Sequence, residues 1–293
     1  MKDFSKRMGI EPTFYYKQSQ LHEKLEQRIR KVKYEFPCQQ KILEAITFAH
    51  IYVHIKSILV SIGKRYNIEG YIDEGILEIP SPVLNKEEIM KYFQFIVKVM
   101  DQYGFVPSSQ MTLEYEGGNH ISFHVNVADT KFINKLCIFL MRNPSIFYAF
   151  LSPYDFASSR IRNVVMSCKG PIRLYKGDAV AYDMRRNRLE LRFFRMPLDV
   201  KEFEYHLDFS VKLMNYVNKA RIETLSESEL RTIHISKALG YGQFGEYFAR
   251  KNHISYETLV ENFKNVAELL KMPGKMPDFV KFNLENRCKN QII

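Results

Sequence analysis

The sequence predicts an α+β fold: a curved antiparallel sheet with helices on one face and an open catalytic bowl on the other. Two observations lead to this fold. Short segments alternate apolar and polar residues with the period of two that belongs to a half-buried β-strand. Each of these segments is followed by one with apolar residues at helical spacing, which can cover the apolar face of the sheet. The polar positions of the strands hold Glu, His and Arg, as expected for a catalytic surface.

Composition places the chain among ordinary soluble globular proteins. Of its 293 residues, 46% are hydrophobic and 26% are charged, which is enough apolar sequence for a full core. No apolar run approaches the ~20 residues of a membrane span, and the N-terminal residues lack the apolar core of a signal peptide. The cysteines are scattered without a CxxC pair: Cys38, Cys137, Cys168 and Cys288. We therefore expect a cytoplasmic protein with reduced thiols and no cysteine-based zinc site.

The chain is basic, with a formal net charge of +10 and a pI near 9.2. Such a charge suits acidic partners, among them nucleotides and nucleic acids. The basic residues are spread out, apart from two clusters at residues 28–33 and 185–188. No helix-turn-helix, zinc-finger or RNP motif accompanies them, so the charge supports nucleic-acid binding only weakly.

Three regions are expected along the chain. Residues 1–27 are polar and predict an N-terminal arm. Residues 28–225 contain the alternating strand and helix patterns and predict the α+β domain. Residues 226–293 lose the strand pattern and predict a helical C-terminal extension, interrupted by the Met-Pro-Gly-Lys-Met-Pro segment at 272–277.

The segment GGNHISFHVNV, residues 117–127, is a clear strand pattern that follows a glycine pair typical of a hairpin turn. Its apolar positions begin with Ile121 and Phe123. Its polar positions are His120, Ser122, His124 and Asn126. Two imidazoles on one strand face can share a metal ion or a phosphate group. The alternative is a hydrated strand face with two incidental histidines.

Two shorter patterns place carboxylates on strands. KVKYEFP at 31–37 predicts a strand that ends at Pro37, with Glu35 on the face opposite the apolar residues. YIDEGILEIPSP at 71–82 predicts a turn and then a strand that carries Glu78 and ends at two prolines. Glu78 is the less easily explained of the two, because its neighbours are apolar.

Helices separate these strands. They are expected at residues 39–66, 85–103, 129–142, 199–220 and 255–272. Capping boxes are formed by Asn85 with Glu88, Asp199 with Glu202, and Ser226 with Glu229. Residues 143–178 lack periodicity and contain Arg160 and Arg162; a long irregular connection in a domain is often functional.

Residues 180–199 predict two strands on either side of an arginine cluster, and the second carries Glu190 and Arg192 on one face. Charged groups therefore recur on four predicted strands: Glu35, Glu78, His120 with His124, and Glu190 with Arg192. Carboxylates with one or two imidazoles suit Mg²⁺ or Mn²⁺. Each residue also has a simpler explanation, such as a solvated Glu35 or an exposed Glu190–Arg192 ion pair of little energetic value.

The order of these motifs resembles that of the amidoligases, phage and bacterial members of the glutamine-synthetase and glutamate-cysteine-ligase-like carboxylate-amine ligases. The family pattern opens with Gly-x-Glu-x-Glu, which KYEFP at 33–37 resembles through Glu35. Lys33 and Pro37 stand where the family has its first glycine and second glutamate. The resemblance spans residues 31 to about 217.

Three later motifs carry the same resemblance. They are DEGILEIPSP at 73–82, GGNHISFHV at 117–125 and ELRFFR at 190–195. In the second motif the family has His-x-His, whereas this chain has His120 and His124, with Ser122 between them.

The resemblance implies an ATP-dependent ligase that uses Mg²⁺ and joins a carboxylate to an amine through an acyl phosphate. The implied ligands of the metal and the ATP phosphates are Glu35, Glu78, His120, His124 and Glu190, with Arg192 also contacting the nucleotide. Arg192 and Arg195 would bind the γ-phosphate or the carboxylate, and Arg160 and Arg162 would gate the substrate. The implied partners are carboxylate and amine substrates, peptides or proteins included.

A second interpretation is a catalytically degenerate protein of the same fold with a structural or binding role, either in a phage virion or on nucleic acid. The altered first motif and the altered histidine spacing favour it. In that case the basic charge would serve an acidic partner. If the chain is phage-encoded, its location would be the host cytoplasm or the virion.

Overall fold

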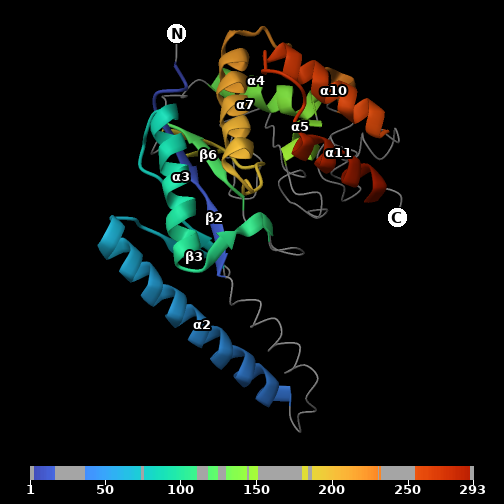
Figure 1. Cartoon of the computed structure of the whole chain (residues 1–293). Coiled ribbons are helices and arrows are strands. Elements are labelled where there is room, and N and C mark those ends of the chain that lie inside the picture. The colour runs from blue at the N-terminus through green and yellow to red at the C-terminus, as the bar shows by residue number, and fades with distance from the viewer. Residues whose placement is uncertain are drawn as a thin grey trace.

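The computed structural model describes residues 3–16, 37–73, 76–110, 118–124, 130–143, 145–150, 180–183, 187–229, 231 and 255–290 (Figure 1). The strands are β1 (Met8–Glu11), β2 (Thr13–Tyr16), β3 (Tyr71–Asp73), β4 (Ile76–Glu78), β5 (Phe105–Pro107), β6 (His120–Phe123), β7 (Val180–Asp183) and β8 (Arg188–Leu191). The helices are α2 (Pro37–Tyr66), α3 (Lys86–Gln102), α4 (Thr130–Arg142), α5 (Ser145–Phe150), α7 (Val200–Lys219), α10 (Tyr256–Leu269) and α11 (Asp278–Asn290), with a 3-10 turn η1 (Ser108–Gln110).

The α+β class is confirmed, but the described strands form two antiparallel sheets where one was predicted. The first sheet has the order β1-β6-β8-β7, and the second has the order β3-β4-β2-β5. Only Pro12 separates β1 from β2, so one stretch of chain runs from the first sheet into the second. Proline cannot donate a ladder hydrogen bond, which suits the point where the chain leaves one sheet for the other. The curvature and the bowl stay predictions.

This linking strand corrects the expectation of an N-terminal arm at residues 1–27. Residues 8–16 belong to the sheets, with Ile10 opposite Ile121 and Phe14 opposite Leu77. Ile10 and Phe14 are buried in the core, and Phe4 is fully buried as well. Residues 17–36 lie outside the described part, and with them Glu35 and most of the strand expected at 31–37.

Helices cover the apolar side of the first sheet. Strand β6 presents Ile121 and Phe123 to the core, as its alternation predicted, and both are fully buried. Helices α3 and α7 pack against each other, with the rings of Phe93 and Phe203 stacked at 3.9 Å between centroids. Figure 1 shows both helices beside β6. The burial of these aromatic side chains contributes to the hydrophobic stabilisation of the domain.

The predicted helix boundaries hold where the structure describes them. Asn85 caps α3 in a reciprocal box with Glu88, and the Ser226 side chain accepts from the Glu229 backbone at 3.2 Å. Asp199 caps α7, but the Glu202 carboxylate turns to Leu198 and Arg195 instead of the cap residue. Pro37 begins α2, a position that suits proline in a helix. No helix in the described ranges is both long and apolar enough to span a membrane.

The C-terminal helices expected after residue 226 are present and pack on the domain. Helices α10 and α11 contact α5, as Figure 1 shows. The ring of Phe263 stacks on Phe209 at 6.1 Å, and Asn283 Nδ2 donates to the carbonyl of Ala149 at 2.8 Å. Because these contacts are buried, the C-terminal helices contribute to the same hydrophobic core.

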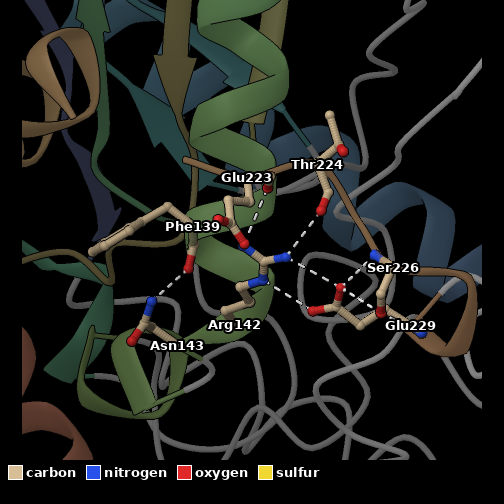
Figure 2. Close-up of polar contacts among 7 residues, drawn as sticks. All are labelled: Phe139, Arg142, Asn143, Glu223, Thr224, Ser226 and Glu229. Carbon is tan, nitrogen blue, oxygen red and sulfur yellow. Dashed lines mark hydrogen bonds and ion pairs between the residues drawn. The ribbon is translucent and has the colours of Figure 1, made fainter. Parts of the chain in front are cut away.

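Arg142, at the end of α4, anchors the segment that leads to these helices (Figure 2). Its Nε and Nη2 donate to the two carboxylate oxygens of Glu229 at 2.9 and 3.1 Å. The guanidinium also donates to the carbonyls of Glu223 and Thr224, both at 3.2 Å. Ser226 donates to the same glutamate through its backbone N–H at 2.7 Å. One fork-shaped guanidinium therefore holds three points of the segment after α7: two carbonyls and a glutamate of the helical turn that Ser226 caps.

Candidate active site

Strands β1 and β6 bring Glu11 and His120 opposite each other on the polar side of the first sheet. His120 Nδ1 lies 3.0 Å from Glu11 Oε2, and His120 is only 6% exposed. Burial alone would raise the pKa of Glu11, but hydrogen bonds from His120 and Tyr71 and the nearby charges of His120 and Arg188 lower it to about 2. Glu11 is therefore an anion held by fixed donors at neutral pH.

Tyr71 connects this pair to the second sheet. Its hydroxyl donates a short hydrogen bond to Glu11 Oε1. In the β3–β4 ladder Tyr71 stands opposite Glu78, and its hydroxyl also interacts with that carboxylate. Burial, together with these two carboxylates, raises the pKa of Tyr71 well above its usual range, so the phenol keeps its proton. The tyrosine thus joins two acidic side chains that would otherwise repel each other.

Strand β8 adds Glu190 and Arg188 to the same side. Glu190 is 8% exposed and stands opposite Ser122 of β6. Arg188 forms an ion pair with Glu190. Arg192 lies just after the end of β8 and is partly buried. We call the surface formed by Gly9, Glu11, His120, Ser122, Arg188 and Glu190 the polar face of the first sheet.

His124 lies just beyond the end of β6, close to Ser122 rather than to His120. Ser122 Oγ and His124 Nε2 are 3.3 Å apart, and the backbone N–H of His124 donates to the carbonyl of Arg7 at 2.9 Å. Burial and the nearby charges of Arg188 and Arg7 lower the pKa of His124, which favours its neutral form. The two histidines of this segment therefore lie in different environments: His120 beside Glu11, and His124 beside Ser122.

Arg195 lies in another environment, at the C-terminal helices. Its Nε donates to Glu202 Oε1 at 2.7 Å, and both side chains are less than 10% exposed. The guanidinium also lies over the ring of Phe279, 5.9 Å from the centroid. These contacts favour a structural role for Arg195. Its role in substrate binding stays a prediction.

The structure thus brings together three of the residues expected at the site. They are His120 and Glu190 on the polar side of the first sheet, and Glu78, which Tyr71 connects to Glu11. Arg192 follows the end of β8, and its role at the site stays a prediction. Glu35, Arg160 and Arg162 lie outside the described residues. Their proposed roles stay predictions.

Sequence reasoning missed Glu11, Tyr71 and Arg188. The signal for Glu11 was present, because Met8-Gly9-Ile10-Glu11 offers the Gly-x-Glu with which the amidoligase pattern opens, where the segment at 33–35 has lysine in place of glycine. The strand pattern of residues 8–16 was not recognised, because Pro12 interrupts it between β1 and β2. Arg188 was placed in a turn cluster, whereas it opens β8.

The donor chemistry suits a hard cation, but the arrangement does not hold one as it stands. Within the described ranges no three His, Cys, Asp or Glu side chains are grouped closely enough to bind a metal ion. Glu11 is engaged by His120 and Tyr71, and Glu190 by Arg188. The polar face therefore does not fit a resident metal in this arrangement.

Comparison with known proteins gives only weak similarity to the solved structure described here. No family model and no curated protein matches the chain. Among solved structures it is similar to one described as "Apo GmaS without ligand". The two chains share 12% sequence identity at a TM-score of 0.44, over 99% of this chain and 70% of that chain. Similarity at this level carries no functional argument, so the proposal below is built on the residues of this chain.

Proposed function

We propose that the chain is an ATP-dependent carboxylate-amine ligase. The observation that supports this most is the meeting of motif residues from distant parts of the chain. Glu11 contacts His120 directly, and Tyr71 connects Glu11 with Glu78. Glu190 stands across the ladder from Ser122 on the same face. Segments around residues 11, 78, 120 and 190 therefore contribute to one charged surface, in the order that the amidoligase pattern requires.

The proposed reaction has two steps. A carboxylate oxygen of the first substrate attacks the γ-phosphorus of ATP, which gives an acyl phosphate and ADP. The amine nitrogen then attacks the acyl carbon, and inorganic phosphate and a proton leave as the amide forms. Partly buried Arg192 is proposed to offset the charge of the phosphoryl oxygens, because a guanidinium stabilises charge best where water is excluded.

Glu11 takes the place proposed for Glu35 in this account. It lies on a strand beside His120, and its pKa of about 2 keeps it ionised at every physiological pH. Mg²⁺ is proposed to arrive with ATP, as the Mg²⁺–nucleotide complex that serves as the substrate. Glu11, Glu78 and Glu190 are the carboxylates that face this substrate in the proposal.

The test is binding of Mg²⁺-ATP, measured by calorimetry on the full chain. We expect Glu11→Gln and Glu78→Gln each to weaken binding at least tenfold while the urea midpoint shows the protein still folded. Glu261→Gln is the matched control, because Glu261 is an exposed glutamate of α10. The absence of Mg²⁺-ATP binding to the unmodified protein would refute the proposed activity.

A second candidate function is a degenerate, non-catalytic member of the same fold that binds an acidic partner. It is favoured by the internal pairing of the carboxylates, since Glu11 is hydrogen-bonded to His120 and Glu190 forms an ion pair with Arg188. Nucleic-acid binding that weakens steeply between 50 and 200 mM salt, as the roughly 10³-fold or greater loss of a many-phosphate interface requires, would favour it. A ligase would show Mg²⁺-ATP binding instead.

A further inference from the structure

Arg188 has one donor for which the described residues offer no acceptor. Its Nη2 pairs with Glu190, but its Nε is buried and has no acceptor among the described residues. A guanidinium carries five N–H donors in a rigid fork that matches the paired oxygens of carboxylate and phosphate. A buried donor without an acceptor is costly, so such a donor is a sign of a ligand.

Three polar atoms converge beside Arg188 over a residue that has no side chain. A Cβ placed on Gly9 would lie 2.7 Å from Ser122 Oγ, 3.3 Å from His124 Nε2 and 3.6 Å from Ser81 Oγ. Ser81 Oγ also accepts the backbone N–H of Ile10 at 2.9 Å, which fixes its position. Glycine is thus needed here to let these polar groups approach the strand closely.

The β6–β8 register brings the Arg188 guanidinium close to the polar atoms over Gly9. Ser122 stands opposite Glu190 and Phe123 opposite Leu189, so the next position along each strand places His124 near Arg188. The positive charge of Arg188 lowers the pKa of both His124 and Glu11. Arg7, whose carbonyl accepts from His124, adds a second positive charge from the other edge of the sheet.

We propose that Arg188, Ser122 and His124 form an oxyanion-binding subsite over Gly9, beside the carboxylates of the polar face. The guanidinium binds two oxygens of the ligand through one edge of its fork, and the Ser122 hydroxyl donates its proton to a ligand oxygen. His124, kept neutral by its surroundings, orients the Ser122 hydroxyl. The ligand class is a carboxylate or a phosphate, and the subsite deepens the proposed ligase function by adding a fixed anion position next to Glu190.

The probes are inorganic phosphate and glutarate, titrated at constant ionic strength and followed by calorimetry on the full chain. We expect Arg188→Gln to weaken binding of the preferred probe at least tenfold. Gly9→Ala should weaken it similarly, because the added Cβ forces Ser122 Oγ away from its place. Arg221→Gln, at an exposed position after α7, is the matched loss of an arginine and should bind as the unmodified protein does.

The two probes distinguish the source of the oxyanion. Stronger glutarate binding that depends on Arg188 assigns the subsite to the carboxylate substrate, and stronger phosphate binding assigns it to the nucleotide or the acyl phosphate. Binding of neither probe, or equal binding by Arg188→Gln and the unmodified protein, overturns the subsite. Urea midpoints show whether the two variants are folded. If Arg188→Gln does not fold, Gly9→Ala provides the test of the subsite.

Parallel titration with Mg²⁺-ATP separates this inference from the proposed activity. If Mg²⁺-ATP binds but neither probe depends on Arg188, the subsite is wrong and the ligase proposal stands. If a probe depends on Arg188 but Mg²⁺-ATP does not bind, the subsite stands and the ligase proposal fails.

Discussion

Two clusters in this molecule are built from the same residue types, yet they differ in access to solvent. The polar face of the first sheet combines Glu11, His120, Arg188 and Glu190. The second cluster, at the start of α7, combines Arg195, Glu202 and His206. Each contains an arginine, a histidine and at least one glutamate.

The second cluster is sealed by aromatic rings. His206 is fully buried, and its ring lies 5.0 Å from that of Phe194 and 5.4 Å from that of Phe279. On the polar face, the side chains of Glu11 and Arg188 are 17% and 28% exposed, against 8% and 4% for Arg195 and Glu202. Residue type alone therefore does not distinguish a candidate active site from a structural cluster. Access to solvent and the partners already present do.

The largest expected effect is at the sealed cluster. Arg195→Met should destabilise the protein by about 3–5 kcal/mol, because it leaves Glu202 as a buried charge without its partner. Urea unfolding of the variant and the unmodified protein measures this difference. A loss of unfolding free energy below about 1 kcal/mol would mean that water reaches Glu202. The two clusters would then not differ in access to solvent.

His206 should make the sealed cluster sensitive to acid. Burial and the nearby Arg195 hold the pKa of His206 well below its usual value of 6.5. Below pH 6.5 the unfolded state therefore binds a proton that the folded state does not, and stability falls as pH decreases, by up to about 1.4 kcal/mol per pH unit. The unfolding free energy of His206→Gln, measured between pH 7 and 5, should lack this slope. If the variant kept the same dependence of stability on pH, His206 would not be the group responsible for the acid sensitivity.

A smaller effect is expected at Arg142, whose ion pair is partly exposed. Arg142→Gln should cost about 1 kcal/mol, because the bidentate pair with Glu229 is partly screened by water. The Arg142 hydrogen bond, which outweighs the effect of burial, lowers the pKa of Glu229 to about 2 from 4.5. The contribution of the Arg142–Glu229 pair to stability is therefore complete above pH 4.5 and is lost as the pH falls toward 2. Urea midpoints at pH 7 and pH 3 should differ less in the variant than in the unmodified protein.

The fold was predictable from the sequence where its signals were local. Helical spacing and capping residues placed α3 and α7 close to their observed ends, because a cap is decided by residues three positions apart. The linking strand was not recognised, because Pro12 breaks the alternation between Ile10 and Phe14. Its role depends on partners about 65 to 110 residues away, which no local pattern contains.

The candidate site was predictable only in part, for a similar reason. Glu78, His120 and Glu190 could be identified as polar residues on strand patterns. Tyr71 and Arg188 could not, because their significance comes from the carboxylates that face them across the ladders. Arg195 shows the opposite case: its motif suggested a ligand contact, while the fold gives it the buried Glu202 as partner.

The comparison between the two clusters is tested most directly by calorimetric titration of Mg²⁺-ATP into Glu11→Gln and Glu202→Gln, with urea unfolding of both. Glu11→Gln should bind Mg²⁺-ATP at least tenfold more weakly and lose only about 1–2 kcal/mol of stability, since the side chain of residue 11 is partly exposed and the amide oxygen can still accept a hydrogen bond. Glu202→Gln should lose more stability than Glu11→Gln, and under conditions where it is folded it should bind Mg²⁺-ATP as the unmodified protein does. Undiminished nucleotide binding by a folded Glu11→Gln would contradict the assignment of the polar face as the active site.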